Sequence, residues 1–215
     1  MKLAFYSTLN KELNKEMDLS VKGLLTAPNL KFTYIPSASD PSRHYFNIAK
    51  EYFADFEFSS FEYFDIDSEF DPSKMNALTE SDVVYLSGGQ TFTLLNNIKN
   101  KNILNFLINF AKSEGKVLIG ASAGAMVMTP SVEVTAYFHR ALGDYKNYNQ
   151  AQVIDFSGLS LVDFEFFPHF TKEKLKDIEP YLKVTKNTVY GCYDNGGIVV
   201  NGDETTLVGH VDKLN

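Results

Sequence analysis

The chain has 215 residues, of which 44% are hydrophobic, and its 20 Lys and Arg against 27 Asp and Glu give a net charge of −7. This length fits one domain over residues 1–215, the apolar fraction excludes a disordered chain, and the acidic balance disfavours nucleic acid or an anionic membrane as a partner. A single cysteine, Cys192, excludes a disulfide framework and a multi-cysteine metal site, and no segment has the apolar length of a membrane span or a secretory signal, so we expect a cytoplasmic protein.

The chain up to Ile119 alternates β-rich runs with helix-period segments. Asp40 and Pro41 have the form of a helix N-cap followed by proline at the first helical position. Further helices are predicted at residues 92–98 and 104–111. The apolar residues that follow Pro41 at helical spacing are Tyr45, Ile48, Ala49, Tyr52 and Phe53. Strands are predicted at residues 2–6, 31–35, 61–66, 82–86 and 117–119.

This alternation favours an α/β fold, with a doubly wound, mostly parallel sheet flanked by helices. The uniformly apolar run at residues 117–119 is typical of a parallel strand that is covered on both faces. Residues 130–160 show no clean period. Shorter strands are predicted at residues 164–167, 188–191, 197–200 and 205–209.

The motif Gly120-Ala121-Ser122-Ala123-Gly124 directly follows the predicted strand 117–119. It has the G-x-S-x-G form of a nucleophile elbow, in which a serine occupies a sharp strand-to-helix turn and small neighbours let the two elements approach. The helix start places backbone N–H groups and a positive dipole end beside the Ser122 hydroxyl. Close strand–helix packing could by itself explain the small residues, but the preceding strand favours a catalytic nucleophile.

A second candidate is the turn Ser87-Gly88-Gly89-Gln90-Thr91, at the end of the fourth predicted strand. Its two glycines let the backbone approach a ligand and direct N–H groups toward it. We expect Gly88 and Gly89 to form an oxyanion hole with the N–H of Ala123. An ordinary tight turn, with Thr91 as a helix N-cap, is the alternative interpretation.

A serine nucleophile needs a base and an acid that orients the base. Of the four histidines, His169 follows a predicted strand, and α/β folds build their sites at strand ends; His139 is the second choice. For the acid, Asp194 also follows a predicted strand, although an Asp-Asn-Gly turn explains it equally well. Glu165 and Asp163 are the alternative carboxylates.

Along the chain, these candidates follow the order nucleophile, base, acid, whereas α/β-hydrolases have the order nucleophile, acid, base. Together with these motifs, the order in this chain resembles peptidase family S51, the family of aspartyl dipeptidase (dipeptidase E) and cyanophycinase. The resemblance implies a fold similar to the class I glutamine amidotransferases, with flavodoxin-like layering, and implies Ser122 as nucleophile and His169 as base. The chain departs from the dipeptidase at Asp194, where a glutamate is usual, and at Gln90, where an asparagine is usual. The segments that carry the resemblance are 87–95, 120–125, 168–171 and, more weakly, 189–194.

We therefore expect a serine peptidase that hydrolyses amide bonds of small peptides through a Ser-His-Asp triad and an acyl-enzyme. We expect it to need no metal or organic cofactor and to be a monomer or a homodimer. Amidotransferase chemistry is disfavoured, because it uses a cysteine at the elbow and Cys192 lies elsewhere. The alternative from another class is a catalytically silent ligand-binding or sensor protein on the same fold, which the shortened acid favours slightly.

For substrate binding we expect Gln90, Thr91, His139 and Arg140 to contribute. Arg43 and Arg140 are the only arginines, so a two-pronged guanidinium contact with a substrate carboxylate needs one of them. The resemblance implies an arginine-bearing segment after the histidine, but residues 171–186 are rich in lysine and contain no arginine. The resemblance thus supports the reaction class better than it supports a particular substrate.

Overall fold

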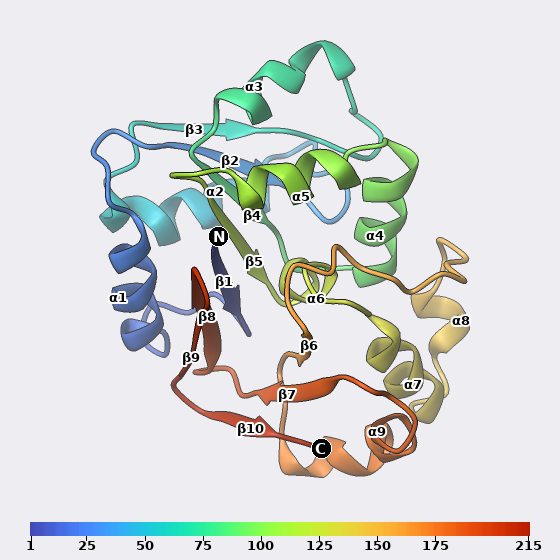
Figure 1. The fold of residues 1–215 in the computed structure, drawn as a ribbon. Helices are drawn as coiled ribbons and strands as arrows, with labels where there is room; N and C mark the ends of the chain where they lie inside the picture. Colours follow the sequence, from blue (N-terminus) through green and yellow to red (C-terminus); the bar gives the residue numbers. More distant parts are fainter.

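A seven-stranded sheet forms the centre of the protein, whose computed structural model describes residues 1–215 (Figure 1). Neighbouring strands pair in parallel from β3 across to β1, and the remaining two strands pair in antiparallel fashion. The predicted α/β class with a mostly parallel sheet is confirmed. In order across the sheet, the strands are β3 (Ser60–Tyr63), β2 (Lys31–Ile35), β4 (Val83–Leu86), β5 (Val117–Ala121), β1 (Lys2–Tyr6), β8 (Gly197–Asn201) and β9 (Glu204–Val208).

Both faces of this sheet are buried under helices. Alternate side chains of a strand point to opposite faces, so in β1 Leu3 and Phe5 join one buried cluster, while Ala4 and Tyr6 join another. Helices α4, α5 and α6 contribute to the first cluster, and α1 and α2 contribute to the second. None of the helices has both the length and the hydropathy needed to cross a bilayer. The helices are α1 (Lys15–Leu24), α2 (His44–Tyr52), α3 (Met75–Glu80), α4 (Thr91–Asn100), α5 (Leu104–Lys112), α6 (Ala123–Val127), α7 (Glu133–Ala141), α8 (Tyr145–Tyr148) and α9 (Leu175–Leu182).

A second, three-stranded sheet lies below β1 and β5 in the view of Figure 1. It consists of β6 (Phe164–Phe167), β7 (Thr188–Cys192) and β10 (Val211–Lys213), with β6 and β7 parallel. Ser7, which directly follows β1, contacts Cys192 at the end of β7. The carboxyl ends of β1 and β7 therefore meet, and segments that follow β5, β6 and β7 can converge there.

The helix predicted to begin at Pro41 begins at His44 instead. Arg43 has a φ of 58°, in the left-handed region, and this separates a turn at residues 40–43 from the helix. Asp40 still acts as a cap from outside the helix, since its carboxylate accepts a hydrogen bond of 2.8 Å from the Tyr45 N–H. The Asp40 carboxylate therefore caps the helix as predicted, but the predicted start of the helix is wrong.

Several elements were not predicted: α1, α3, α7, α8 and β10. Helix α1 does carry a helical signal, because its buried residues Met17, Val21 and Leu24 recur at spacings of four and three. Helices α7 and α8 fall within residues 130–160, where aromatic and polar residues obscure the period. The predicted strand 61–66 ends at Tyr63, and its last residues continue as a buried loop.

Two glycines let α6 pack directly on the sheet. A Cβ on Gly124 would lie 1.9 Å from the Leu86 carbonyl oxygen in β4, and a Cβ on Gly120 would lie 2.5 Å from the Ala125 nitrogen. Any side chain at these positions would push the helix away from β4 and β5. The small residues around Ser122 thus allow the close approach that the sequence predicted.

Gly124→Ala should lower the free energy of unfolding by about 2–3 kcal/mol, because the added methyl group would overlap backbone atoms that have no room to move. Gly23→Ala is the matched control: nothing lies within 4 Å of its added carbon, so it should raise stability by about 0.5 kcal/mol through the helix preference for alanine. Urea denaturation measures both effects. Equal stabilities of the two variants would contradict the packing argument.

Candidate active site

Ser122 occupies the turn between β5 and α6 in a strained backbone conformation, with φ 49° and ψ −111°. A positive φ at a non-glycine residue costs about 1–3 kcal/mol and persists only where the surroundings hold it. Hydrogen bonds hold it on both sides: its N–H donates to the Tyr6 carbonyl at 2.9 Å, and its carbonyl accepts from the Met126 N–H at 3.0 Å. The strand–turn–helix context predicted for this serine is therefore present.

His169 lies between Ser122 and Asp194 and contacts both side chains. Its Nε2 is 2.9 Å from the Ser122 Oγ, and its Nδ1 is 2.7 Å from the Asp194 Oδ1. An ionised carboxylate can only accept, so Nδ1 carries the proton, and in the neutral ring Nε2 is left to accept from the serine hydroxyl. The structure thus brings together the three residues that the sequence singled out as nucleophile, base and acid.

Ser7, which the sequence analysis did not consider, ties the histidine segment to the end of β7. The Ser7 hydroxyl donates to the Cys192 carbonyl at 2.9 Å and accepts from the His169 N–H at 2.7 Å. His169 itself has a positive φ of 53°. The only signal in the sequence is a polar residue directly after an apolar strand, and many strands in α/β proteins end that way.

The imidazole and its carboxylate are open to solvent: the side chains of His169 and Asp194 are 43% and 57% exposed. A contact this exposed adds little to stability, because water screens it and competes for it. The main effect of the contact between Asp194 and His169 is to orient the imidazole ring and to select its tautomer. A small molecule can reach this edge of the site without a conformational change.

Glu165, one of the two alternative carboxylates, forms its hydrogen bonds with residues other than His169. It is fully buried and accepts hydrogen bonds from Tyr181, Thr185 and Asn187. Burial raises the pKa of its carboxyl, although these hydrogen bonds lower it in part. Asp163, the other alternative, is exposed and precedes β6, at the end of the strand opposite to His169. Asp194 is therefore the carboxylate that meets the histidine.

The loop after β4 lies beside the serine. A Cβ on Gly88 would lie 3.4 Å from the Ser122 Cβ, so Gly88 lies close to the Ser122 side chain. Gly89 has a φ of 129°, and a Cβ there would lie 2.2 Å from the Ser37 Oγ. As the first residue of α6, Ala123 has an amide without a partner inside the helix. These are the three positions at which we expected the oxyanion hole.

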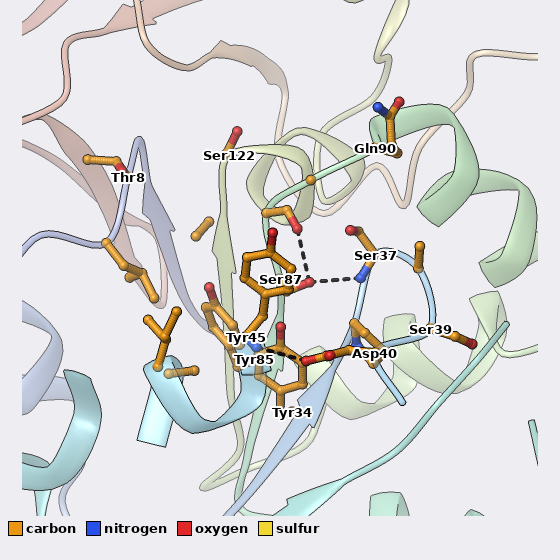
Figure 2. Close-up of a pocket in the computed structure, with 18 of the residues that line it drawn as sticks. Thr8, Tyr34, Ser37, Ser39, Asp40, Tyr45, Tyr85, Ser87, Gln90 and Ser122 are labelled. Atoms are coloured by element: carbon orange, nitrogen blue, oxygen red, sulfur yellow. Dashed lines mark hydrogen bonds between the residues drawn. The ribbon is translucent and has the colours of Figure 1, made fainter. Parts of the chain in front are cut away.

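A cavity of about 590 Å³ opens beside Ser122 (Figure 2). His169 is among the residues that line it. Gly88, Gly89 and Gln90, from the loop after β4, line it. Its remaining walls come from the ends of β1, β2, β4 and β5, from the segment that leads into α2, and from α2 itself. The α2 residues among them, Tyr45, Ile48 and Ala49, were predicted only as part of an apolar helix face.

Three predicted substrate contacts do not line this cavity: Thr91, His139 and Arg140. They surround α8 instead, which the sequence analysis did not predict. The His139 ring stacks on Tyr148 at 3.5 Å, the Thr91 hydroxyl is 3.1 Å from the Tyr148 hydroxyl, and the Arg140 guanidinium lies 4.6 Å from the Tyr145 ring centre. The structure therefore places these three residues away from the cavity beside Ser122, and their part in substrate binding stays a prediction.

Cys192 is fully buried at the end of β7, as expected for a small apolar residue. Burial raises the pKa of its thiol well above the usual value, which disfavours the reactive thiolate. No group of three or more His, Cys, Asp or Glu side chains is arranged to hold a metal ion.

The chain is similar to known peptidases over most of its length. The sequence profile described as peptidase family S51 matches residues 3–208. An uncharacterized peptidase of Pasteurella multocida, PM1590, is 26% identical over 84% of this chain and 85% of its own length. A probable alpha-aspartyl dipeptidase of Drosophila melanogaster is 25% identical over 64% of this chain and 58% of its own length. The crystal structure of a peptidase from an acI-B1 Actinobacterium superposes with a TM-score of 0.73 at 18% identity, covering 99% of this chain and 90% of that chain.

The buried Glu165 carboxyl should make stability depend on pH. Because burial raises its pKa, the native state binds this proton more tightly than the unfolded chain, so its contribution is fully present below the ordinary carboxyl pKa and is lost as the pH rises toward the raised value. Glu165→Gln removes this titration. As the pH rises above about 4, the urea midpoint of the wild type should therefore fall relative to that of the variant.

Asp163→Asn is the control for this measurement, because it removes a carboxylate from the same region at an exposed position. Its urea midpoint should follow the wild type at every pH. If the curve of Glu165→Gln also ran parallel to that of the wild type, burial of Glu165 would not be coupled to its ionisation.

Proposed function

The chain belongs to peptidase family S51, and on that premise we propose that it hydrolyses amide bonds of small peptides with Ser122 as nucleophile, His169 as base and Asp194 as orienting acid. The observation that carries the proposal is the pair of contacts through the imidazole, 2.9 Å to the serine hydroxyl and 2.7 Å to the carboxylate. Both distances lie in the range of about 2.6–3.2 Å in which a positioned base can take a proton.

In the proposed reaction, the Ser122 oxygen attacks the substrate carbonyl carbon while His169 Nε2 takes the hydroxyl proton. Asp194 holds the proton on Nδ1 and stabilises the imidazolium that forms. The imidazolium then gives its proton to the leaving amine, and an acyl-enzyme remains on Ser122. Water, deprotonated by His169, attacks this ester and releases the acid product.

The backbone around the serine supplies the proposed oxyanion hole. The amides of Gly88 or Gly89 and of Ala123 flank Ser122, and donors held by a rigid backbone stabilise the developing negative charge without reorganising. The packing of α6 on β4 brings these two loops together. Loss of one such donor typically costs about 100–1,000-fold in rate.

Small peptides are the proposed substrates for two reasons. The cavity volume of about 590 Å³ lies within the range of roughly 300–1,000 Å³ that is usual for small-molecule sites. The Drosophila relative is named a probable alpha-aspartyl dipeptidase, which supports dipeptides as the substrate class. The choice of side chain is a separate question, which depends on the walls of the cavity.

Ser122→Ala should lower the rate of dipeptide hydrolysis by about 10⁴-fold or more, because no other hydroxyl lies beside His169 Nε2. A fluorophosphonate probe should label the wild type on the peptide that contains Ser122 and leave the variant unlabelled, as mass spectrometry would detect. Ser20→Ala, on α1 and outside the cavity, is the control and should be labelled like the wild type. Equal labelling of the Ser122 variant, or an unreactive wild type, would refute the proposed nucleophile.

Asp194→Asn should lower kcat by about 10³–10⁴-fold, because an amide can donate to Nδ1 and so favours the tautomer that cannot accept the serine proton. The fold should be unaffected, since the side chain is mostly exposed. Asp163→Asn carries the same substitution at an exposed position away from His169 and should retain wild-type activity. A loss of less than about 10-fold at Asp194 would reject it as the orienting acid.

A further inference from the structure

The walls of the cavity beside Ser122 are largely apolar and aromatic. They are formed by the end of β2, the end of β4, the loop after β1 and one side of α2 (Figure 2). The large side chains among them are Leu9, Tyr34, Pro36, Tyr45, Ile48 and Tyr85. Hydroxyl side chains lie between them, at Thr8, Ser37, Ser39 and Ser87. Aromatic and aliphatic walls are typical of sites that bind apolar parts of a ligand.

Two of these residues are apolar side chains that the protein itself leaves exposed. Tyr45 is 64% exposed and Ile48 is 47% exposed, although both lie on the helix face that also carries the buried Ala49. An exposed apolar side chain on its own needs no explanation, but these two line the same cavity as the serine and the histidine. They offer apolar surface that a bound side chain could cover.

The charge on the cavity walls has one sign. No lysine or arginine lines the cavity, and apart from His169 and three tyrosines the only ionisable side chain there is Asp40. Burial raises the pKa of the Asp40 carboxyl, but the hydrogen bonds that it accepts from the Ser42 hydroxyl and from the α2 amides outweigh this effect, so its pKa lies below the usual value. Asp40 is therefore an anion at neutral pH. Arg43 donates to the Asp40 carbonyl oxygen at 2.6 Å, but its guanidinium pairs with Glu69 and does not line the cavity.

We infer, on the basis of the proposed function, that this cavity receives the substrate side chain next to the scissile bond, that it prefers a bulky apolar or aromatic side chain, and that it disfavours an acidic one. An acidic side chain would lose its hydration to aromatic walls, find no cation, and face the Asp40 carboxylate. An aromatic side chain would instead bury surface against Tyr45, Ile48 and their neighbours.

The first test compares dipeptides that differ only in the residue whose carbonyl is attacked: Phe-Leu, Ala-Leu and Asp-Leu. We expect kcat/KM for Phe-Leu to exceed that for Ala-Leu by about 10-fold or more, as burial of an aromatic side chain implies. We expect Asp-Leu to be cleaved more slowly than Ala-Leu. Cleavage of Asp-Leu as fast as Phe-Leu would overturn the inference.

The second test introduces a cation into the wall. Ile48→Arg changes an exposed helix residue, so the fold should tolerate it. It should lower kcat/KM for Phe-Leu and raise it for Asp-Leu, shifting their ratio by about 10-fold or more toward the acidic substrate. Leu19→Arg is the matched control, because Leu19 is an apolar residue of α1, 71% exposed, outside the cavity. An unchanged ratio for Ile48→Arg would overturn the assignment of this wall to the substrate side chain.

A third measurement separates this inference from the proposed chemistry. Calorimetric binding of the same dipeptides to Ser122→Ala should follow the order Phe-Leu, Ala-Leu, Asp-Leu, whether or not Ser122 is the nucleophile. If the wild type neither cleaves a dipeptide nor reacts with fluorophosphonate, the proposed function is rejected. The order of binding affinities then still tests whether the cavity prefers an apolar side chain. Equal or undetectable binding of the three peptides would reject the cavity as a side-chain site.

Discussion

The packing of α6 against β4 and β5 is the constraint on which the candidate site depends. Helix and sheet approach so closely that a Cβ on Gly124 would lie 1.9 Å from the Leu86 carbonyl oxygen. The chain therefore passes from strand to helix within a single residue, and Ser122 takes up this change with a φ of 49°. The cost of about 1–3 kcal/mol is confined to one position and is offset by the main-chain hydrogen bonds on either side. The same close approach brings the loop after β4 beside the serine hydroxyl.

The second sheet supplies the other two groups. Since β6 and β7 run parallel, the residues that follow them emerge at the same edge, His169 after one strand and Asp194 after the other. Ser7 joins this edge to β1 through one hydroxyl, which contacts both the Cys192 carbonyl and the His169 amide. The backbone contact thus fixes where the histidine segment lies, whereas the contact with Asp194 orients the imidazole ring. Its place opposite Ser122 depends on how the two sheets dock.

The groups proposed to react and the cavity walls come from different parts of the fold. Ser122, His169 and Asp194 follow β5, β6 and β7, whereas the apolar walls belong mainly to β2, β4 and α2. A substitution on α2 can therefore change which side chain is accepted without moving the groups proposed to react. The apolar period that predicted α2 contains the same separation: Tyr52 packs in the buried cluster, while Ile48, one turn earlier, lines the cavity. Periodicity shows which side chains share a helix face, but it does not show whether that face meets the core or an open site.

The sequence alone determined the strands of the central sheet and the turn at Ser122, because apolar runs and small residues act through neighbours a few positions away. It also restricted the base and the acid to a few residues that follow strands. Only the tertiary structure decided that His169 meets Ser122 across 47 residues of chain and Asp194 across 25. It also decided that Glu165 is buried among hydroxyl and amide donors and that His139 stacks on α8. The reason is physical: a strand end can be inferred from local preferences, but which strand ends face one another depends on how two sheets bury their apolar surfaces together.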